Sequence, residues 1–195
     1  MGALYLDGTY NSTISQATGV GLGVGALTSP ATSGEYAMLR GDHLALAQTA
    51  VDAYQLTALV SLPSIADVFA EVGFCDSDRT DYARLLFDTS VDSTYWRFET
   101  RDGSTQNATT LPTAAAVDTY VWLDVLFNAE HAAAWFNGDG PYPLYDNLPG
   151  TSLTPYVLVG TRTSTAKVLN VDRVSCIAVA GDVVSPAHSA LTGSQ

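Results

Sequence analysis

The chain has 195 residues, 47% of them hydrophobic, so it can bury one core of ordinary size and is too apolar to be disordered throughout. The formal net charge is -12 and Lys167 is the only lysine, so nucleic acid and anionic membranes, which need basic surfaces, are not expected as partners. The sequence has no apolar run of about 20 residues and no basic stretch before an apolar one at its start. It therefore predicts neither a membrane span nor a signal peptide.

Residues 1–34 differ from the rest because glycine alternates there with apolar residues. The alternation runs through Gly19, Val20, Gly21, Leu22, Gly23, Val24 and Gly25. If this stretch is extended, one face carries no side chains and another backbone can approach it closely. A flexible arm would explain the glycines but not the regular apolar residues between them. We therefore expect an N-terminal arm that becomes ordered against a partner.

Short strand-like runs follow one another from Glu35 onward, separated by Gly, Pro, Asn and Asp. They cover residues 36–39, 44–49, 54–60, 68–75, 82–87, 95–101, 105–110, 155–160, 166–171 and 173–180. An alanine-rich segment at 113–117 is too short to form a helix alone. This pattern predicts an all-β fold, an antiparallel two-sheet β-sandwich over residues 35–182, with a small polar tail at 183–195.

The clearest pair of strands is a hairpin with strands at 121–127 and 132–136. The first strand is apolar at every second position, which is the period of strand geometry. Its other face, with Trp122 and Asp124, is interpreted as packing and hydrogen bonding within the sandwich. Pro141 is expected to end the pairing because it has no N–H.

Four short motifs in a fixed order suggest a known fold. They are Glu71-Val72-Gly73-Phe74, Tyr95-Trp96-Arg97-Phe98-Glu99-Thr100, Tyr120-Val121-Trp122-Leu123-Asp124-Val125 with Trp135-Phe136-Asn137-Gly138, and Asn170-Val171-Asp172-Arg173-Val174. Their order resembles the concanavalin A-like lectin/glucanase jelly roll in its laminin-G-like form. The resemblance implies that fold, which serves lectins, glycosidases, adhesion modules and virion proteins alike.

Catalytic chemistry is not expected from the carboxylates. Glycosidases of the family that the chain resembles place two glutamates on one strand, so that an acid and a nucleophile face the same sugar. Here the glutamates are Glu35, Glu71, Glu99 and Glu130, and no two share a predicted strand. The histidines are scattered and there is no Gly-x-Ser-x-Gly turn. We therefore expect no enzymatic activity.

An acidic loop is the candidate metal site. Asp76, Asp78 and Asp81 follow the strand at 68–75 and could supply oxygen ligands for Ca²⁺. The loop lacks the Gly and the terminal Glu of a recognised calcium loop, and the alternative is a solvated turn. Laminin-G-like modules often hold calcium at a sheet rim, which the resemblance extends to this loop. No other cofactor is expected.

Exposed aromatic rings could contact a partner, because a sugar ring stacks on an aromatic face. Tyr142 and Tyr145 are the candidates because they lie in a proline-containing loop. Trp96, Trp122 and Trp135 could also form such a platform, but at least some of them are expected to be core residues. Cys75 and Cys176 lie in apolar runs and are interpreted as buried free thiols, and whether they pair is left open.

Two functions are compatible with these features. The first is a non-catalytic structural virion protein of a tailed phage or related virus, associated with the capsid or the tail. Residues 19–25, with Tyr142 and Tyr145, would then bind neighbouring virion proteins and other copies of the chain, as a homotrimer. Such a protein would be made in the host cytoplasm and displayed on the virion surface. The alternative is a lectin-like module that binds host glycans through its rim loops.

Overall fold

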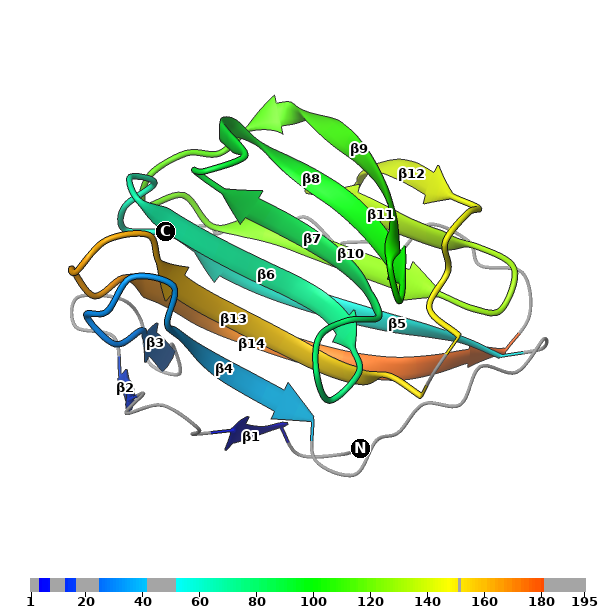
Figure 1. Cartoon of the computed structure of the whole chain (residues 1–195), viewed down its shortest axis with the longest axis horizontal. Coiled ribbons are helices and arrows are strands. Elements are labelled where there is room, and N and C mark those ends of the chain that lie inside the picture. The colour runs from blue at the N-terminus through cyan, green and yellow to red at the C-terminus, as the bar shows by residue number, and fades with distance from the viewer. Residues whose placement is uncertain (1–3, 8–12, 17–24, 42–51, 151, 181–195) are drawn as a thin grey trace, which may run out of the picture.

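Two antiparallel sheets packed face to face form the molecule (Figure 1). The computed structural model describes residues 4–7, 13–16, 25–41, 52–150 and 152–180. None of these residues lies in a helix, so this part of the chain has no helix that could cross a membrane. The expected all-β antiparallel sandwich is confirmed.

Each sheet has seven strands within the described ranges. Sheet A runs in the order β1 (Leu4–Asp7), β4 (Tyr36–Gly41), β13 (Thr154–Thr161), β6 (Val68–Cys75), β7 (Tyr82–Asp88), β8 (Asp92–Asp102) and β9 (Thr105–Ala114). Sheet B runs in the order β12 (Asp139–Leu144), β11 (Ala132–Phe136), β10 (Val121–Phe127), β5 (Asp52–Ser61), β14 (Val168–Ala180), β3 (Gly25–Thr28) and β2 (Thr13–Gln16). Half of the neighbouring pairs are consecutive strands, such as β6, β7 and β8, and the other half join strands that are far apart in sequence.

The core lies between the sheets and is built from alternate residues of each strand. Aromatic rings meet there across the sheets: the ring centres of Phe74 and Phe127 are 4.7 Å apart, and Trp96 lies 6.4 Å from Phe136. The apolar face of β10 points into this core, as its period predicted. On its opposite face Asp124 accepts hydrogen bonds from Thr57 and Gln55, which confirms a structural role for that side.

Two strand predictions were wrong. The chain pairs beyond Pro141, since β12 binds β11 along residues 139–144. A proline is tolerated there because β12 is an edge strand and needs partners on one side only. The two strands expected at 166–171 and 173–180 form the single strand β14, whose register with β5 shifts between Val171 and Arg173.

The first part of the chain is joined to both sheets where it is described. β1 pairs with β4 at the edge of sheet A, while β2 and β3 continue sheet B beyond β14. Ala26 and Leu27 of β3 are buried. The strand expected at 44–49, the expected contact segment at residues 19–24 and the tail at 183–195 lie outside the described residues.

Candidate functional site

The outer face of sheet A, turned away from the core, carries a network of paired charges. Residues directly opposite each other in an antiparallel sheet share a face, as do residues two apart along a strand. One row across this face runs through Arg40, Tyr156, Gly73, Arg84, Glu99 and Ala108. The next row runs through Met38, Leu158, Glu71, Leu86, Arg97 and Thr110. The register thus places arginines of β7 and β8 beside glutamates of β6 and β8.

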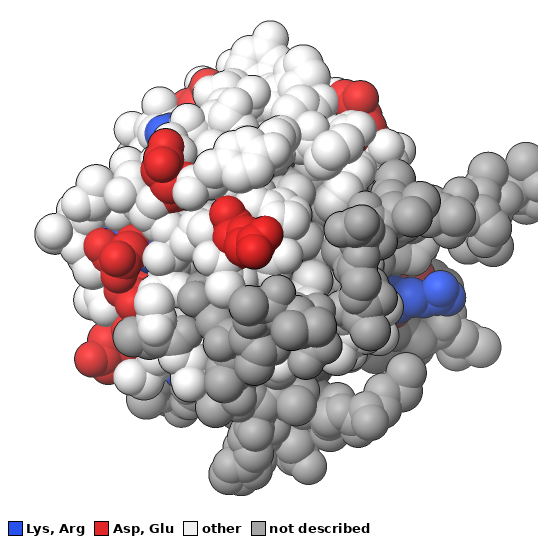
Figure 2. All heavy atoms as spheres, turned by 90° about the vertical axis from the view of Figure 1, so that its right-hand side faces the viewer, with Lys and Arg blue, Asp and Glu red and all other residues white. Residues whose placement is uncertain are grey.

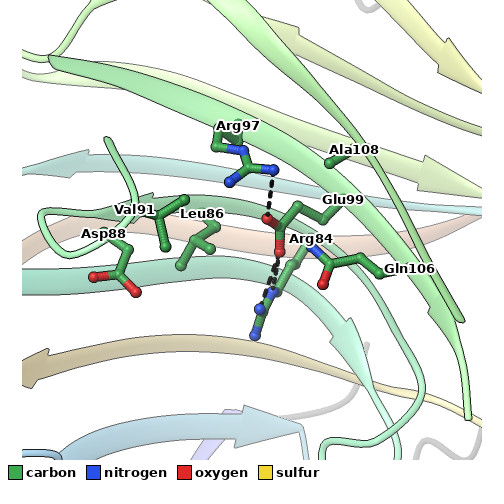
Figure 3. A pocket seen from close by; sticks show the side chains of 8 residues that line it. All are labelled: Arg84, Leu86, Asp88, Val91, Arg97, Glu99, Gln106 and Ala108. Carbon is green, nitrogen blue, oxygen red and sulfur yellow. Dashed lines mark hydrogen bonds and ion pairs between the residues drawn. The ribbon is translucent and has the colours of Figure 1, made fainter. Parts of the chain in front are cut away.

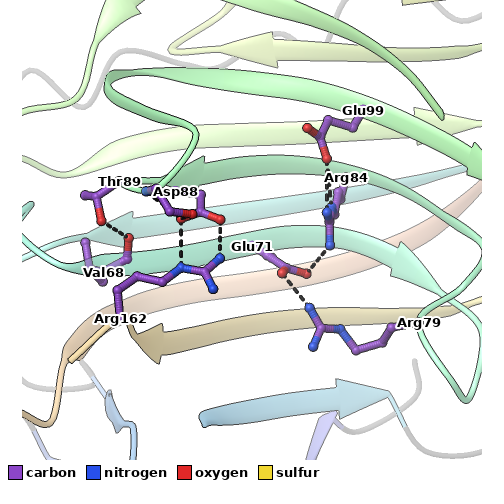
Figure 4. Close-up of polar contacts among 9 residues, drawn as sticks. Val68, Glu71, Arg79, Arg84, Asp88, Thr89, Glu99 and Arg162 are labelled. Carbon is purple, nitrogen blue, oxygen red and sulfur yellow. Dashed lines mark hydrogen bonds and ion pairs between the residues drawn. The ribbon is translucent and has the colours of Figure 1, made fainter. Parts of the chain in front are cut away.

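Glu71 on β6 is the centre of this network (Figure 4). Arg79 Nη2 donates to Glu71 Oε1 at 2.5 Å, and Arg84 Nη1 lies 3.0 Å from Oε2. The Tyr156 hydroxyl donates to the same Oε2 at 2.6 Å. Because Glu71 is only 2% exposed, these three partners replace the water that its carboxylate would otherwise bind.

The electrostatics keep this carboxylate ionised. Burial raises the pKa of Glu71, but the attraction of Arg84 and Arg79 and the Tyr156 hydrogen bond outweigh it, so the pKa lies below its ordinary value. Burial beside that negative charge holds the pKa of the Tyr156 hydroxyl well above its usual range. At neutral pH the pair is therefore a fixed negative charge with a protonated phenol bound to it.

Arg84 links Glu71 to a second carboxylate, that of Glu99 (Figure 4). Its Nε and Nη2 donate to Glu99 Oε2 at 3.2 and 3.0 Å. Arg97 is held more loosely, with its Nη2 3.6 Å from Glu99 Oε1. A contact of 3.6 Å is too long for a hydrogen bond. Arg84 thus binds two carboxylates, whereas Arg97 makes only a loose contact with one.

A second ion pair lies on the same face, close to the β7–β8 turn. Arg162 Nε donates to Asp88 Oδ1 at 2.9 Å, and Arg162 Nη2 binds Asp88 Oδ2. Burial raises the pKa of Asp88, but hydrogen bonds from Arg162 and Ser90 lower it below its ordinary value. This carboxylate is therefore also ionised at neutral pH.

Three of the arginines lie over aromatic rings of this face. The distances from Cζ to the ring centre are 4.7 Å for Arg79 and Tyr36, 3.9 Å for Arg84 and Tyr82, and 4.3 Å for Arg162 and Phe69. A planar guanidinium can stack on a ring and still bind a carboxylate at its edge. These three rings, on β4, β7 and β6, are consequently covered by the protein's own cations.

An open groove of about 490 Å³ lies on the other side of this network, over β7, β8 and β9 (Figure 3). Its lining residues are Arg84, Leu86, Asp88, Val91, Arg97, Glu99, Gln106 and Ala108. Figure 3 shows the Arg97 and Gln106 side chains on opposite sides of Glu99. The groove thus offers hydrogen-bond donors and acceptors beside a small apolar surface.

No two of the glutamates share a strand, as the sequence indicated, but two of them meet in the fold. Glu71 and Glu99 come from β6 and β8, the two neighbours of β7, and both bind Arg84. Sequence reasoning also missed Arg97 and Tyr156. The only signal in the sequence is that each of these residues is polar in a strand whose alternate positions are apolar.

The predicted calcium ligands take part in a turn. Asp76 accepts hydrogen bonds from Thr80 N at 2.8 Å and Asp81 N at 3.1 Å, and Asp81 accepts one from Gly103 N at 2.6 Å. The described residues contain no group of three His, Cys, Asp or Glu side chains that could hold a metal ion. On the end of the molecule seen in Figure 2, acidic side chains outnumber basic ones on the coloured surface. Calcium binding by Asp76, Asp78 and Asp81 stays a prediction without support from this geometry.

The predicted contact tyrosines lie in or just after the edge strand of sheet B and do not line the groove. Tyr142 is on β12, and its hydroxyl donates to Asp139. Burial and Asp139 raise the pKa of Tyr142 to about 12. Tyr145 is 67% exposed, with its ring centre 6.2 Å from that of His131. Their role in partner binding stays a prediction, as does that of residues 19–25, of which only Gly25 is described.

The remaining candidates are structural. Trp96 and Trp135 are buried, at 2% and 3% exposure, and so cannot be sugar platforms. Cys75 and Cys176 are free thiols that form no disulfide with each other. Burial raises the pKa of Cys75 to about 12 and that of Cys176 to about 11, so neither is a reactive thiolate at neutral pH.

Similarity to known proteins is found at the level of structure. No family model matches the chain, and no curated protein matches it. Alginate lyase AlyC3 in complex with dimannuronate has a TM-score of 0.66 at 8% identity, over 82% of this chain and 76% of that one. An endo-1,3-beta-glucanase from Streptomyces sioyaensis has a TM-score of 0.62 at 9% identity, over 83% and 77%. Carbohydrate-binding module CBM66 from Bacillus subtilis has a TM-score of 0.57 at 11% identity, over 85% and 91%.

These likenesses contradict two expectations from the sequence. The prediction of a structural virion protein is wrong. The similar structures named here are carbohydrate-active proteins, and they give no support to a phage setting. The expectation of no enzymatic activity is also contradicted, because alginate lyases and a glucanase are among them. At 8–11% identity for the three structures described, the likeness shows the fold alone. The chain therefore has the concanavalin A-like jelly-roll fold that its sequence motifs suggested.

Proposed function

We propose that this protein binds a carbohydrate in the groove over β7, β8 and β9, and that the carbohydrate carries carboxylate groups. The observation that supports the proposal is the position of Arg97. Its side chain is 25% exposed, and its one ion pair among the described residues is the 3.6 Å contact with Glu99. A guanidinium has five N–H donors, so most of those of Arg97 are available to an anionic ligand in the groove.

The other lining residues suit a ligand rich in hydroxyl groups. Gln106 can both donate and accept hydrogen bonds, and Glu99 accepts them. Arg84 and Asp88 are held rigidly by their ion pairs, so little side-chain freedom is lost when a ligand binds beside them. Leu86 and Val91 supply apolar contact to the C–H groups of a sugar ring.

The fold is compatible with such a ligand. One similar structure is an alginate lyase in complex with dimannuronate, a disaccharide whose units carry carboxylates, and another is a carbohydrate-binding module. A shared fold does not transfer a substrate. The likeness therefore only adds to the argument from Arg97.

The test is binding of alginate oligosaccharides and of a neutral 1,3-β-glucan oligosaccharide, measured by isothermal titration calorimetry. We expect the wild-type protein to bind the uronate and to bind the neutral glucan more weakly. Arg97→Gln should weaken uronate binding by roughly tenfold or more, because a charge-assisted hydrogen bond contributes about 1.5–3 kcal/mol.

Arg173→Gln is the matched control, since Arg173 is an exposed arginine on β14 of sheet B. It should leave the affinity unchanged. The same samples should be assayed for unsaturated products and reducing ends, which would extend the assignment from binding to cleavage. Absence of uronate binding, or equal binding by Arg97→Gln, contradicts the proposal.

A further inference from the structure

We infer that Tyr95 is a stacking platform at one end of this groove, so that the site recognises a sugar ring on Tyr95 next to an anionic group on Arg97. The inference deepens the proposed function and rests on it. It assigns a binding role to a residue that does not line the groove itself.

The strand geometry of β8 places these residues on one surface. Trp96 and Phe98 point into the core and are 2% and 0% exposed. Tyr95, Arg97 and Glu99 alternate with them and so fall on the outer face, although the register of β8 with β9 shifts between Tyr95 and Arg97. Residues two apart along a strand are separated by roughly 6.6 Å, which is comparable with the length of one sugar unit. A ligand lying along β8 would therefore meet the ring of Tyr95 and the charge of Arg97 with neighbouring units.

Tyr95 differs in exposure from the other rings of this face. It is 37% exposed, whereas Tyr82 and Phe69 are 3% and 5% exposed and lie under arginines, and Tyr156 is fully buried against Glu71. The rings closer to the centre of sheet A are thus occupied by the protein's own cations. Tyr95 offers aromatic surface to solvent.

The backbone around Tyr95 is held firmly. Asp92 Oδ1 accepts hydrogen bonds from Thr94 N at 2.8 Å and from Tyr95 N at 3.0 Å. Beyond the end of β9, Ala115 N donates to Thr94 O at 2.8 Å. A platform on a fixed backbone loses less conformational entropy when a ligand binds than one on a mobile loop.

The same end of the groove is also apolar. Val91, which lines the groove in the β7–β8 turn, is 53% exposed. The C–H groups on the face of a pyranose can pack on Tyr95 and Val91, while its edge hydroxyls and carboxylate reach polar side chains. The site thus joins an apolar end to a cationic one, which fits an acidic saccharide and not an inorganic anion.

The test compares a monouronate with a uronate disaccharide, using the full-length wild-type protein and its variants in calorimetry. A monouronate can occupy the Arg97 position alone, whereas the disaccharide can reach Tyr95 as well. Tyr95→Ala and Tyr95→Leu should each lower disaccharide affinity by roughly three- to tenfold, and Tyr95→Phe should not. None of the three should change monouronate affinity, a selectivity that a merely structural role would not produce.

Ile177→Ala is the control, because Ile177 is an exposed apolar residue on β14 of sheet B and does not line the groove. Thermal unfolding of every variant checks folding, and Tyr95→Leu keeps apolar bulk should Tyr95→Ala be unstable. If the wild type binds neither uronate, the proposed function fails and the inference with it. If the wild type binds, Arg97→Gln weakens binding and the Tyr95 variants bind like wild type, the inference is overturned while the proposed function stands.

Discussion

The carboxylate of Glu71 holds together an arginine and a tyrosine from neighbouring strands and an arginine from the β6–β7 loop. Arg79 and Arg84 are both raised in pKa by their attraction to Glu71, against the effect of burial. The arrangement is mutually dependent, since each partner is largely buried and each would be costly to leave without the others. Glu71 thus fixes Arg84 beside the groove, but it is itself too deeply buried to contact a ligand.

Glu71→Gln should destabilise the fold by about 3 kcal/mol, because it leaves two partly buried arginines facing a neutral amide. The amide keeps the shape of the side chain and can still accept from Tyr156, so the loss reports charge and not volume. Urea unfolding at pH 7 measures it. Glu130→Gln, at an exposed position, is the control and should change stability little.

The same substitution should flatten the acid dependence of stability. The folded-state pKa of Glu71 is depressed, so its contribution is fully present above its unfolded pKa of about 4.3 and is lost as the pH falls through the lower folded value. The wild type should therefore lose stability below about pH 4.3 more steeply than Glu71→Gln. Parallel curves for the two proteins would contradict this assignment.

The strands themselves were easier to predict from the sequence than the pairing between them. β6 has the predicted bounds, and β10 and β11 form the predicted hairpin, because the period of two is a local signal. The pairing of β6 with β13 and of β5 with β14 depends on which strands lie side by side after folding. That information is not local. Glu71, Arg84 and Glu99 lie on the consecutive strands β6, β7 and β8, but their meeting depends on the register between these strands, which the strand pattern alone does not fix.

Glycine marks one such non-local contact, between β13 and β6. Gly160 lies opposite Phe69 in the register, and a Cβ at Gly160 would overlap the Phe69 ring. That ring lies under Arg162, which binds Asp88. The close packing of β13 on β6, and the position of Arg162 beside Asp88, thus depend on the absence of a side chain at Gly160.

Gly160→Ala should destabilise the protein by about 1–3 kcal/mol through overpacking. Combining it with Phe69→Leu should cost less than the sum of the two single changes, because the smaller side chain makes room for the methyl group. A double-mutant cycle in urea measures the coupling. Gly150→Ala is the control, since a Cβ there would meet only Asp102 Oδ1 at 3.8 Å. Additive effects of the two changes would show that the ring and the methyl group do not compete for space.

The whole molecule distributes its few positive charges unevenly. The chain has eight Lys and Arg residues. Six of them are on sheet A or reach over its outer face: Arg40, Arg79, Arg84, Arg97, Arg101 and Arg162. The remaining two are Lys167 and Arg173. A protein of net charge -12 thus gathers most of its cations on sheet A, with Arg84 and Arg97 in the groove, while its overall field repels anions.

These opposing effects predict an unusual salt dependence for an anionic oligosaccharide. At 0.01 M ionic strength the screening length is about 30 Å, so an approaching ligand experiences the net negative charge of the whole protein. At 0.15 M it is about 8 Å, and only nearby charges such as Arg97 act on it. The association rate constant should therefore increase with salt over this range. The dissociation rate constant should increase as well, because salt also weakens the contact with Arg97.

Surface plasmon resonance with the uronate oligosaccharide measures both rates, and the neutral glucan serves as the control with little salt dependence of either. An association rate that falls as salt is added would mean that the arginines of sheet A, and not the net charge, set the field at the distance of encounter. The mutual position of the cations on this face, and not their small number, would then decide how an anionic saccharide is captured.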